Sequence, residues 1–214
     1  MREIIAVYGG TFDPPHLGHE AVLAAACGTY SRALVIPARR PPHKELDGLT
    51  PGHEHRYEMA RLLVSAFPNA SVSRIELSQD APRYTVDTLE AVRALYPDWG
   101  LALVVGGDMF MELPKWRDFG SIARMAEIAV ARRTEARDAA LNAAETYRRE
   151  YGARVKFLDF EPADVSSTAI RAALSREDAR RAVSGLPERV RAYILENGLY
   201  VNGRIDKGTN TGRQ

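Results

Sequence analysis

The stretch GGTFDPPHLGH occupies residues 9–19 and directly follows the apolar run Glu3–Tyr8 (EIIAVY). This short, β-rich run predicts a buried strand of a parallel sheet that ends at the glycine pair Gly9-Gly10. Beyond the polar loop, residues His16–Cys27 predict a helix, with Gly28 as its expected stop. A strand, a glycine-containing turn and a helix in this order predict the first unit of an α/β fold.

The same alternation continues along most of the chain. It predicts a doubly wound, Rossmann-like, mainly parallel sheet. The further expected strands are Ala33–Ile36, Ser71–Leu77, Leu101–Val105, Ile128–Ala131 and Val155–Phe160. The further expected helices are Pro51 to about Ala66 with Thr50 as its N-cap, Thr85–Leu95, and a solvated helix over Glu135–Tyr151.

The end of the chain has a different pattern, which predicts a small C-terminal helical cap at about residues 175–201. Ser175 and Asp178 begin one expected short helix that ends at Gly185, and Pro187 begins another that ends at Gly198. Residues 202–214 are expected to form a loose tail. We therefore expect a single domain over residues 1–201.

Composition excludes several classes of protein. The 214 residues are 45% hydrophobic and 27% charged, which is ordinary for a soluble globular chain. A net charge of +1 argues against a general affinity for nucleic acid. Cys27 is the single cysteine and cannot form an internal disulfide, which favours a reducing, cytoplasmic location. No apolar run is long enough to predict a membrane span or a signal peptide.

The loop after the first strand has the features of a phosphate site, although it matches neither the P-loop nor the G-x-G-x-x-G pattern. Gly9 and Gly10 allow a ligand close to the backbone, and a helix start attracts an anion. His16 and His19 are three residues apart and therefore share one helix face. Two alternatives remain, namely helix capping with packing, or a metal site, against which no third ligand stands at short spacing.

Two further loops have features that could bind phosphate. One carries basic side chains, and the other carries a helix N-cap followed by an arginine. Pro37–Lys44 is rich in proline and basic residues, and Lys44 is the expected phosphate clamp, with a solvated loop or RNA binding as alternatives. After the last strand, Val165–Arg171 reads VSSTAIR. Ser166 or Ser167 predicts an N-cap, and Arg171 one turn later suits a phosphate, although this sequence alone is also an ordinary cap. Two such helix starts facing one crevice would suit a triphosphate.

These motifs resemble those of the nucleotidyltransferase superfamily, through the His-x-Gly-His core of residues 16–19 and through VSSTAIR. Pro41–Lys44 (PPHK), Tyr84–Leu89 (YTVDTL), and Gly106-x-Asp108 with Trp116 resemble the bacterial nicotinate-nucleotide adenylyltransferase family. The resemblance implies transfer of AMP from ATP to nicotinate mononucleotide, with release of pyrophosphate. It further implies Mg²⁺ held mainly by the ATP phosphates, and a homo-oligomer is compatible with the sequence.

The resemblance also implies residue roles. Catalysis would rest on cationic or protonated groups around the transferred phosphate, and no side chain is assigned as a metal ligand. The implied catalytic residues are His16, His19, Lys44 and Arg171. The implied ATP-binding residues are Gly9, Gly10, Thr11, Phe12, His16, His19, Gly106, Asp108, Ser167, Thr168 and Arg171. The implied residues for the mononucleotide are Lys44, Tyr84, Thr85 and Trp116.

Two departures from the family pattern bear on details. Arg117 stands where an aromatic residue is frequent, so it is expected to be solvated or to reach a phosphate. Gly107 precedes Asp108 where a larger residue is usual, which could loosen that turn. The alternatives are an adenylyltransferase for nicotinamide mononucleotide or phosphopantetheine, and, in a different class, a non-catalytic nucleotide sensor. A synthetase-like module is disfavoured because the chain leaves no room for a tRNA-binding domain.

Overall fold

A six-stranded, entirely parallel sheet forms the centre of the computed structural model, which describes residues 3–39, 50–131, 137–176 and 183–201. The strand order is β3-β2-β1-β4-β5-β6, so the chain switches direction across the sheet between β1 and β4. This confirms the doubly wound α/β prediction. The strands are β1 Ile4–Gly10, β2 Arg32–Pro37, β3 Ala70–Val72, β4 Gly100–Gly106, β5 Ala126–Ala131 and β6 Val155–Leu158.

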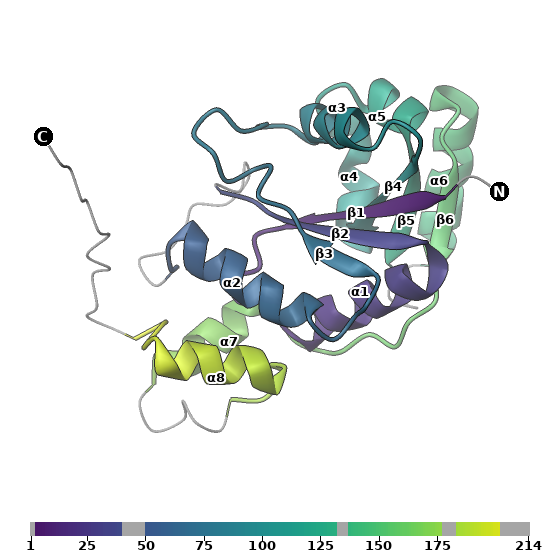
Figure 1. Cartoon of the computed structure of the whole chain (residues 1–214). Coiled ribbons are helices and arrows are strands. Elements are labelled where there is room, and N and C mark those ends of the chain that lie inside the picture. The colour runs from purple at the N-terminus through teal and green to yellow at the C-terminus, as the bar shows by residue number, and fades with distance from the viewer. Residues whose placement is uncertain (1–2, 40–49, 132–136, 177–182, 202–214) are drawn as a thin grey trace, which may run out of the picture.

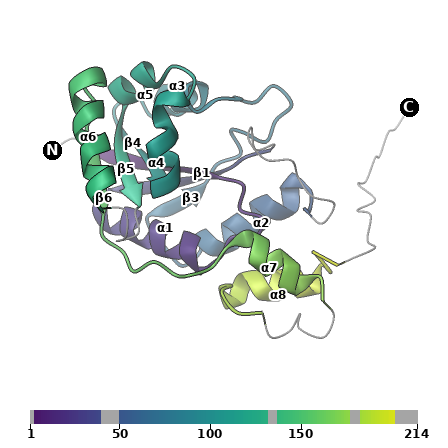
Figure 2. The same cartoon turned by 180° about the vertical axis from the view of Figure 1, so that it is seen from behind.

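Helices cover both faces of the sheet (Figures 1 and 2). Along each strand, alternate side chains enter two different cores, as the two-residue period of a strand requires. Ile5 and Val7 of β1 belong to one core, while Ala6 and Tyr8 belong to the other. The helices are α1 Leu17–Thr29, α2 His53–Val64, α3 Thr85–Leu95, α4 Gly107–Glu112, α5 Phe119–Met125, α6 Arg137–Tyr151, α7 Ser167–Leu174 and α8 Glu188–Glu196, with a 3₁₀ helix η1 at Leu113–Lys115.

The two C-terminal helices pack against α2 rather than against the sheet. Ile170 and Leu174 of α7 and Val190 and Ile194 of α8 share a third core with Met59 of α2. Figure 2 shows α7 and α8 together beside α2, at one side of the molecule. The helix that we expected from Ser175 and Asp178 to Gly185 falls mostly on residues 177–182, outside the described part. Ser175 itself is the C-cap of α7.

Several predicted boundaries were wrong, each for a local reason. Thr50 does not cap α2, because its hydroxyl donates to Asp13 and Gly52 takes the N-cap position. Helix α1 continues through Gly28 and ends at Thr29, before Tyr30 turns into the core. The strand predicted at Ser71–Leu77 stops at Val72, since the apolar residues beyond it pack from a turn.

Two helical regions also differ from expectation. Helix α6 is not solvated throughout, because Ala140, Ala144 and Tyr147 line one buried face. Helices α4 and α5 were not predicted at all. They are 6 and 7 residues long, too short to display a clear 3.6-residue period.

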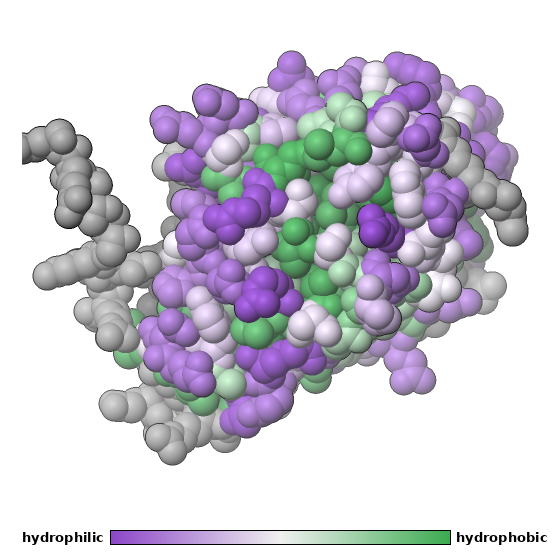
Figure 3. All heavy atoms as spheres, in the orientation of Figure 1, coloured by the Kyte–Doolittle hydropathy of each residue, from purple (hydrophilic) through white to green (hydrophobic). Residues whose placement is uncertain are grey.

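The outer surface is mixed in polarity. Figure 3 shows a band of apolar surface across the middle of one face, in the region where Figure 1 places the strands, with hydrophilic residues around it. Of the helices in the described segments, not one combines the length and the apolar character needed to cross a bilayer.

The junction before α8 provides a test of the fold. Gly185 has a φ of +86°, and a Cβ atom there would lie 2.7 Å from Cγ1 of Val165. We expect Gly185→Ala to lower the free energy of unfolding by about 2 kcal/mol or more, through backbone strain and overpacking. Gly28→Ala is the matched control, because a Cβ there meets nothing within 4 Å. It should stabilise helix α1 by about 0.5–1 kcal/mol. Urea unfolding measures both, and equal effects of the two changes would contradict the proposed strain.

Candidate active site

The first loop of the site begins where β1 ends. Gly9 and Gly10 are the last residues of β1, and a Cβ on Gly9 would meet nothing within 4 Å. Phe12 adopts a φ of 50°, and its ring is 1% exposed against Tyr8 and His19. The Phe12 side chain is therefore part of the core. The role expected of this residue at the ATP site stays a prediction.

The two histidines cap helix α1 reciprocally. Nδ1 of His16 accepts hydrogen bonds from the backbone N–H groups of Gly18 (3.1 Å) and His19 (3.4 Å). The backbone N–H of His16 in turn donates to Nδ1 of His19 (3.2 Å), and the ring centroids are 3.8 Å apart. Because Nδ1 is the acceptor in both rings, each neutral ring carries its proton on Nε2. The cap thus uses Nδ1 of both rings and does not engage Nε2 of His16.

His16 is a neutral donor rather than a cation. Burial lowers the pKa of His16 from its ordinary 6.5 to about 4. Protonation would also convert Nδ1 from an acceptor into a donor and break the cap. The expectation of a protonated histidine is therefore wrong for His16 at neutral pH.

Asp13, through its buried carboxylate, anchors the loop that follows β1. Its carboxylate is 4% exposed and accepts hydrogen bonds from the hydroxyls of Thr50 (2.7 Å) and Tyr200 (2.8 Å). Burial and the Asp13 charge raise the pKa of Tyr200 well above its ordinary value, so this hydroxyl stays a donor. Nη1 of Arg171 lies 3.6 Å from the carboxylate and donates to the Asp13 carbonyl at 2.8 Å. The network brings α7 to the first loop.

The start of α7 touches the same loop. Ser166 is its N-cap and accepts from the N–H of Ala169, as predicted for one of the two serines. Ser167 donates its hydroxyl to the Pro14 carbonyl (3.1 Å), while Thr168 is exposed. The backbone N–H of Leu17 also donates to the carbonyl of Gly185 (2.8 Å). The structure therefore joins the starts of α1 and α7 through residues 13–17.

Arg56 is a residue that sequence reasoning missed. It is 1% exposed, and its guanidinium donates to the carbonyls of Thr11 (2.9 Å), Ala38 (2.6 Å) and Arg39 (2.8 Å). Burial lowers the pKa of Arg56 below its ordinary value. By binding these carbonyls, Arg56 fixes the loop after β1 beside the loop after β2. In the sequence it resembles any arginine of an amphipathic helix.

The expected mononucleotide residues follow β3 and β4. Tyr84 is the N-cap of α3 and is 43% exposed, and Thr85 is the first residue of that helix. Trp116 is partly buried against the core next to η1. The guanidinium of Arg117 lies 4.5 Å from the centroid of the Tyr84 ring. Arg117 is exposed, in agreement with the expectation of a solvated side chain, and it also stacks on Tyr84.

The remaining predicted site residues lie after β4 and in the basic loop. Gly106 is the N-cap of α4, and Asp108 is exposed in its first turn. Gly107 begins α4, so the turn is closed by a helix rather than loosened. Lys44 lies outside the described residues. Within the described segments no group of three or more His, Cys, Asp or Glu side chains could hold a metal ion.

The depressed pKa of His16 predicts a specific pH dependence of stability. Between pH 6.5 and about 4 the unfolded chain binds a proton at His16 that the folded chain excludes, so stability falls as the pH falls through this window. Because the ring is only partly buried, we expect a loss of about 1–2 kcal/mol rather than the full linkage value. In His16→Asn, which retains a capping oxygen but cannot titrate, this part of the pH dependence should vanish. Urea unfolding of both proteins from pH 7 to 4 measures the difference, and identical pH profiles would contradict the assignment.

Comparison with known proteins identifies the family. The cytidylyltransferase-like family model matches residues 7–173. The nicotinate-nucleotide adenylyltransferase of Bacillus subtilis is 31% identical, over 92% of this chain and 97% of its own length. A "Probable nicotinate-nucleotide adenylyltransferase" of Halorhodospira halophila is 37% identical, over 92% and 94% of the two chains.

A solved structure shares the fold. Nicotinic acid mononucleotide adenylyltransferase of Plasmodium falciparum, complexed with NaAD, superposes with a TM-score of 0.73 at 18% identity, over 92% of this chain and 97% of that one. The chain therefore belongs to the cytidylyltransferase-like family and, within it, to the nicotinate-nucleotide adenylyltransferases.

Proposed function

We propose that the protein transfers the adenylyl group of ATP to nicotinate mononucleotide, producing nicotinate adenine dinucleotide and pyrophosphate. The observation that carries this proposal is the reciprocal histidine cap at the carboxyl edge of the sheet, beside the start of α7. Ligands of open α/β sheets bind at this edge, near the switch in strand order. The names of the relatives support the same activity.

The chemistry requires positioning rather than a general base. A phosphate oxygen of the mononucleotide is already anionic, and it attacks the α-phosphorus of ATP. The new P–O bond forms as the bond to the β-phosphate oxygen breaks, and the electron pair leaves with pyrophosphate. The difficulty is to bring two polyanions together, so preorganised donors around the transferred phosphate provide the rate enhancement.

We assign to the residues the roles that the family resemblance implies. His16 and His19 would donate from Nε2 to phosphate oxygens as charge develops on them. Lys44 and Arg171 would supply positive charge, with Arg171 oriented by its contacts to Asp13. Further ATP contacts would come from the backbone of Gly9, Gly10, Thr11 and Phe12, from Ser167 and Thr168 at the start of α7, and from Gly106 and Asp108 after β4.

Mg²⁺ is the implied cofactor, and the residues fit an ion carried by the substrate. Asp13 belongs to the histidine loop, and its oxygens already accept from Thr50 and Tyr200. Asp108 is exposed after β4 and belongs to no group of three or more ligating side chains in the described segments, which suits a water-mediated or ribose contact better than a cage. When bound, the ion would offset the charge of the β- and γ-phosphates.

The mononucleotide would bind at the start of α3. Thr85 and its neighbours offer backbone N–H groups, and Trp116 and Tyr84 offer aromatic surface. A nicotinate carboxylate can accept such N–H bonds, whereas the NH₂ of an amide cannot. Lys44 would contact the same substrate. We further propose a cytoplasmic enzyme that acts as one domain over residues 1–201, with no nucleic-acid or membrane partner and with a homo-oligomer compatible with the sequence.

The histidine roles can be tested by pyrophosphate release from Mg-ATP and nicotinate mononucleotide. We expect His16→Ala and His19→Ala each to lower kcat/KM by about 10² or more, which corresponds to a lost transition-state donor of about 3 kcal/mol. His55→Gln is the control, because His55 bonds the hydroxyl of Tyr193 between α2 and α8. It should retain wild-type activity. Rates within about threefold of wild type for both alanine variants would contradict the assigned roles.

Substrate choice provides a second test. We expect kcat/KM for nicotinate mononucleotide to exceed that for nicotinamide mononucleotide by about tenfold or more, with no turnover of phosphopantetheine. Initial rates of pyrophosphate release with each acceptor measure this. Preference for another acceptor would support the alternative enzyme, and tight ATP binding without turnover of any acceptor would support the nucleotide sensor.

A further inference from the structure

A cavity lies at the opposite edge of the sheet from the candidate active site. It has a volume of about 410 Å³, which falls within the range of small-molecule sites. Its walls include the first or second residue of three strands, namely Ile4 of β1, Leu101 of β4 and Glu127 of β5. Since all strands are parallel, these residues lie at the amino edge, whereas the histidine cap follows the carboxyl edge. The two sites are therefore separated by the length of the strands, about 20 Å.

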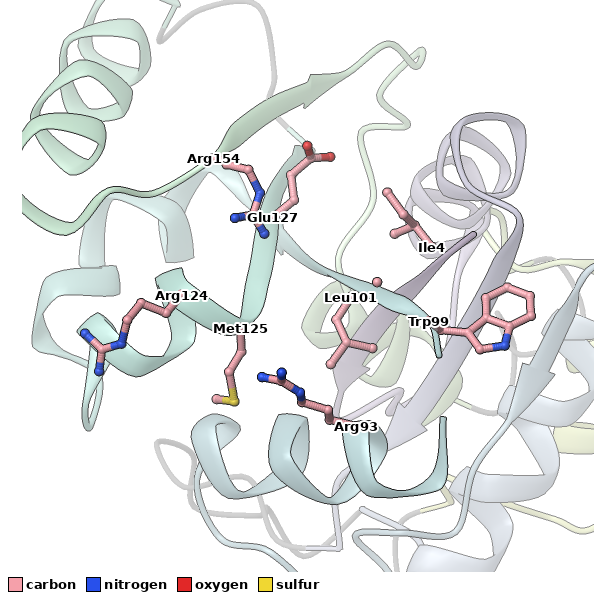
Figure 4. A pocket seen from close by; sticks show the side chains of 9 residues that line it. Ile4, Arg93, Trp99, Leu101, Arg124, Met125, Glu127 and Arg154 are labelled. Carbon is pink, nitrogen blue, oxygen red and sulfur yellow. The ribbon is translucent and has the colours of Figure 1, made fainter. Parts of the chain in front are cut away.

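The charge of this cavity is predominantly positive. Of its nine lining residues, Arg93, Arg124 and Arg154 are cationic and Glu127 is acidic. Glu127 is already engaged, because it accepts a hydrogen bond of 2.7 Å from the hydroxyl of Tyr30. Figure 4 shows Arg93 extending from α3 toward Met125, Arg154 beside Glu127, and Arg124 pointing away from the others. Arg93 and Arg154 are thus the cations placed to meet a ligand.

Interaction with a helix dipole explains the position of one of these arginines but not that of the other. Arg93 stands in the last turn of α3, where a cation interacts favourably with the helix dipole. Arg154, however, belongs to the segment between α6 and β6 and ends no helix. Its backbone carbonyl accepts from the N–H of Ile128 (2.7 Å), which fixes the base of its side chain at the cavity. The rest of the wall is largely apolar and includes Leu101 and Trp99.

We propose that this cavity binds a small phosphate monoester that carries a flat apolar body. The two guanidinium groups outweigh the single negative charge of Glu127, so the cavity favours an anion, and the guanidinium fork suits phosphate oxygens. The apolar wall would receive the body of the ligand. The site is independent of the adenylyl-transfer chemistry, and its ligand need not be a substrate of that reaction.

The two tryptophans of the chain allow the two sites to be observed separately. Trp99 lines this cavity, whereas Trp116 lies beside η1 after β4. Their indole N–H signals, assigned with Trp99→Phe and Trp116→Phe, can be followed by NMR during titration with phenyl phosphate. We expect a saturable shift of the Trp99 signal. Inorganic phosphate should bind more weakly, and benzyl alcohol, which lacks the charge, should give no saturable shift.

Three variants establish whether the arginines are responsible. The double variant Arg93→Gln, Arg154→Gln should weaken phenyl phosphate binding by about tenfold or more. Glu127→Gln, which keeps an acceptor for Tyr30 but removes the negative charge, should strengthen it. Arg148→Gln is the control, because Arg148 pairs with Glu145 on α6, and it should leave the affinity unchanged.

Two results would overturn the proposal. One is a Trp99 signal that does not shift saturably with phenyl phosphate. The other is an affinity that stays the same in the double variant while its thermal stability falls, which would assign the arginines to stabilising their helix and strand ends. Neither result depends on the catalytic activity of the protein.

Discussion

The buried carboxylate of Asp13 is the constraint on which the rest of the site depends. It connects four parts of the chain that are distant in sequence, because Thr50, Arg171 and Tyr200 all converge on it. A buried carboxylate without such partners would be strongly unfavourable. Its burial therefore requires the first loop, the start of α7 and the C-terminal cap to come together. The histidine cap begins three residues further along the chain, so its geometry depends on that arrangement.

The strands and the outline of the site were accessible from sequence because their signals are local. Apolar runs closed by glycines identified β1 and β4, and Val165–Arg171 identified the capped start of α7. The contacts that support the site could not be predicted, because their partners lie far apart in the sequence. Tyr200 and Asp13 are 187 positions apart in the sequence. The residues that flank Arg56 in the sequence do not distinguish it from a solvated arginine, although its guanidinium binds remote carbonyls. The contact of Arg117 with the ring of Tyr84 could not be predicted for the same reason, since Tyr84 belongs to another element.

The electrostatics of the site differ from a simple cluster of cations. At least one of its two imidazoles is neutral, because burial and the cap disfavour the charged form. A neutral N–H donor fixed by two backbone bonds requires little reorganisation when charge develops on a phosphate, whereas a mobile cation would have to be reoriented. Arg56 donates to three backbone carbonyls of the loops, and Arg171 donates to the carbonyl of Asp13. Positive charge near the site is therefore used partly to shape the backbone rather than only to attract substrate.

The hydrogen bond between Tyr200 and Asp13 also sets an order of events in biosynthesis. The Tyr200 hydroxyl that completes the anchor is made 187 residues after Asp13. A nascent chain can pair its first strands well before that moment, while the carboxylate still lacks this donor. Competence for nucleotide chemistry would then arise only after Tyr200 has been made, so translation products truncated before it would fold in part yet remain inert.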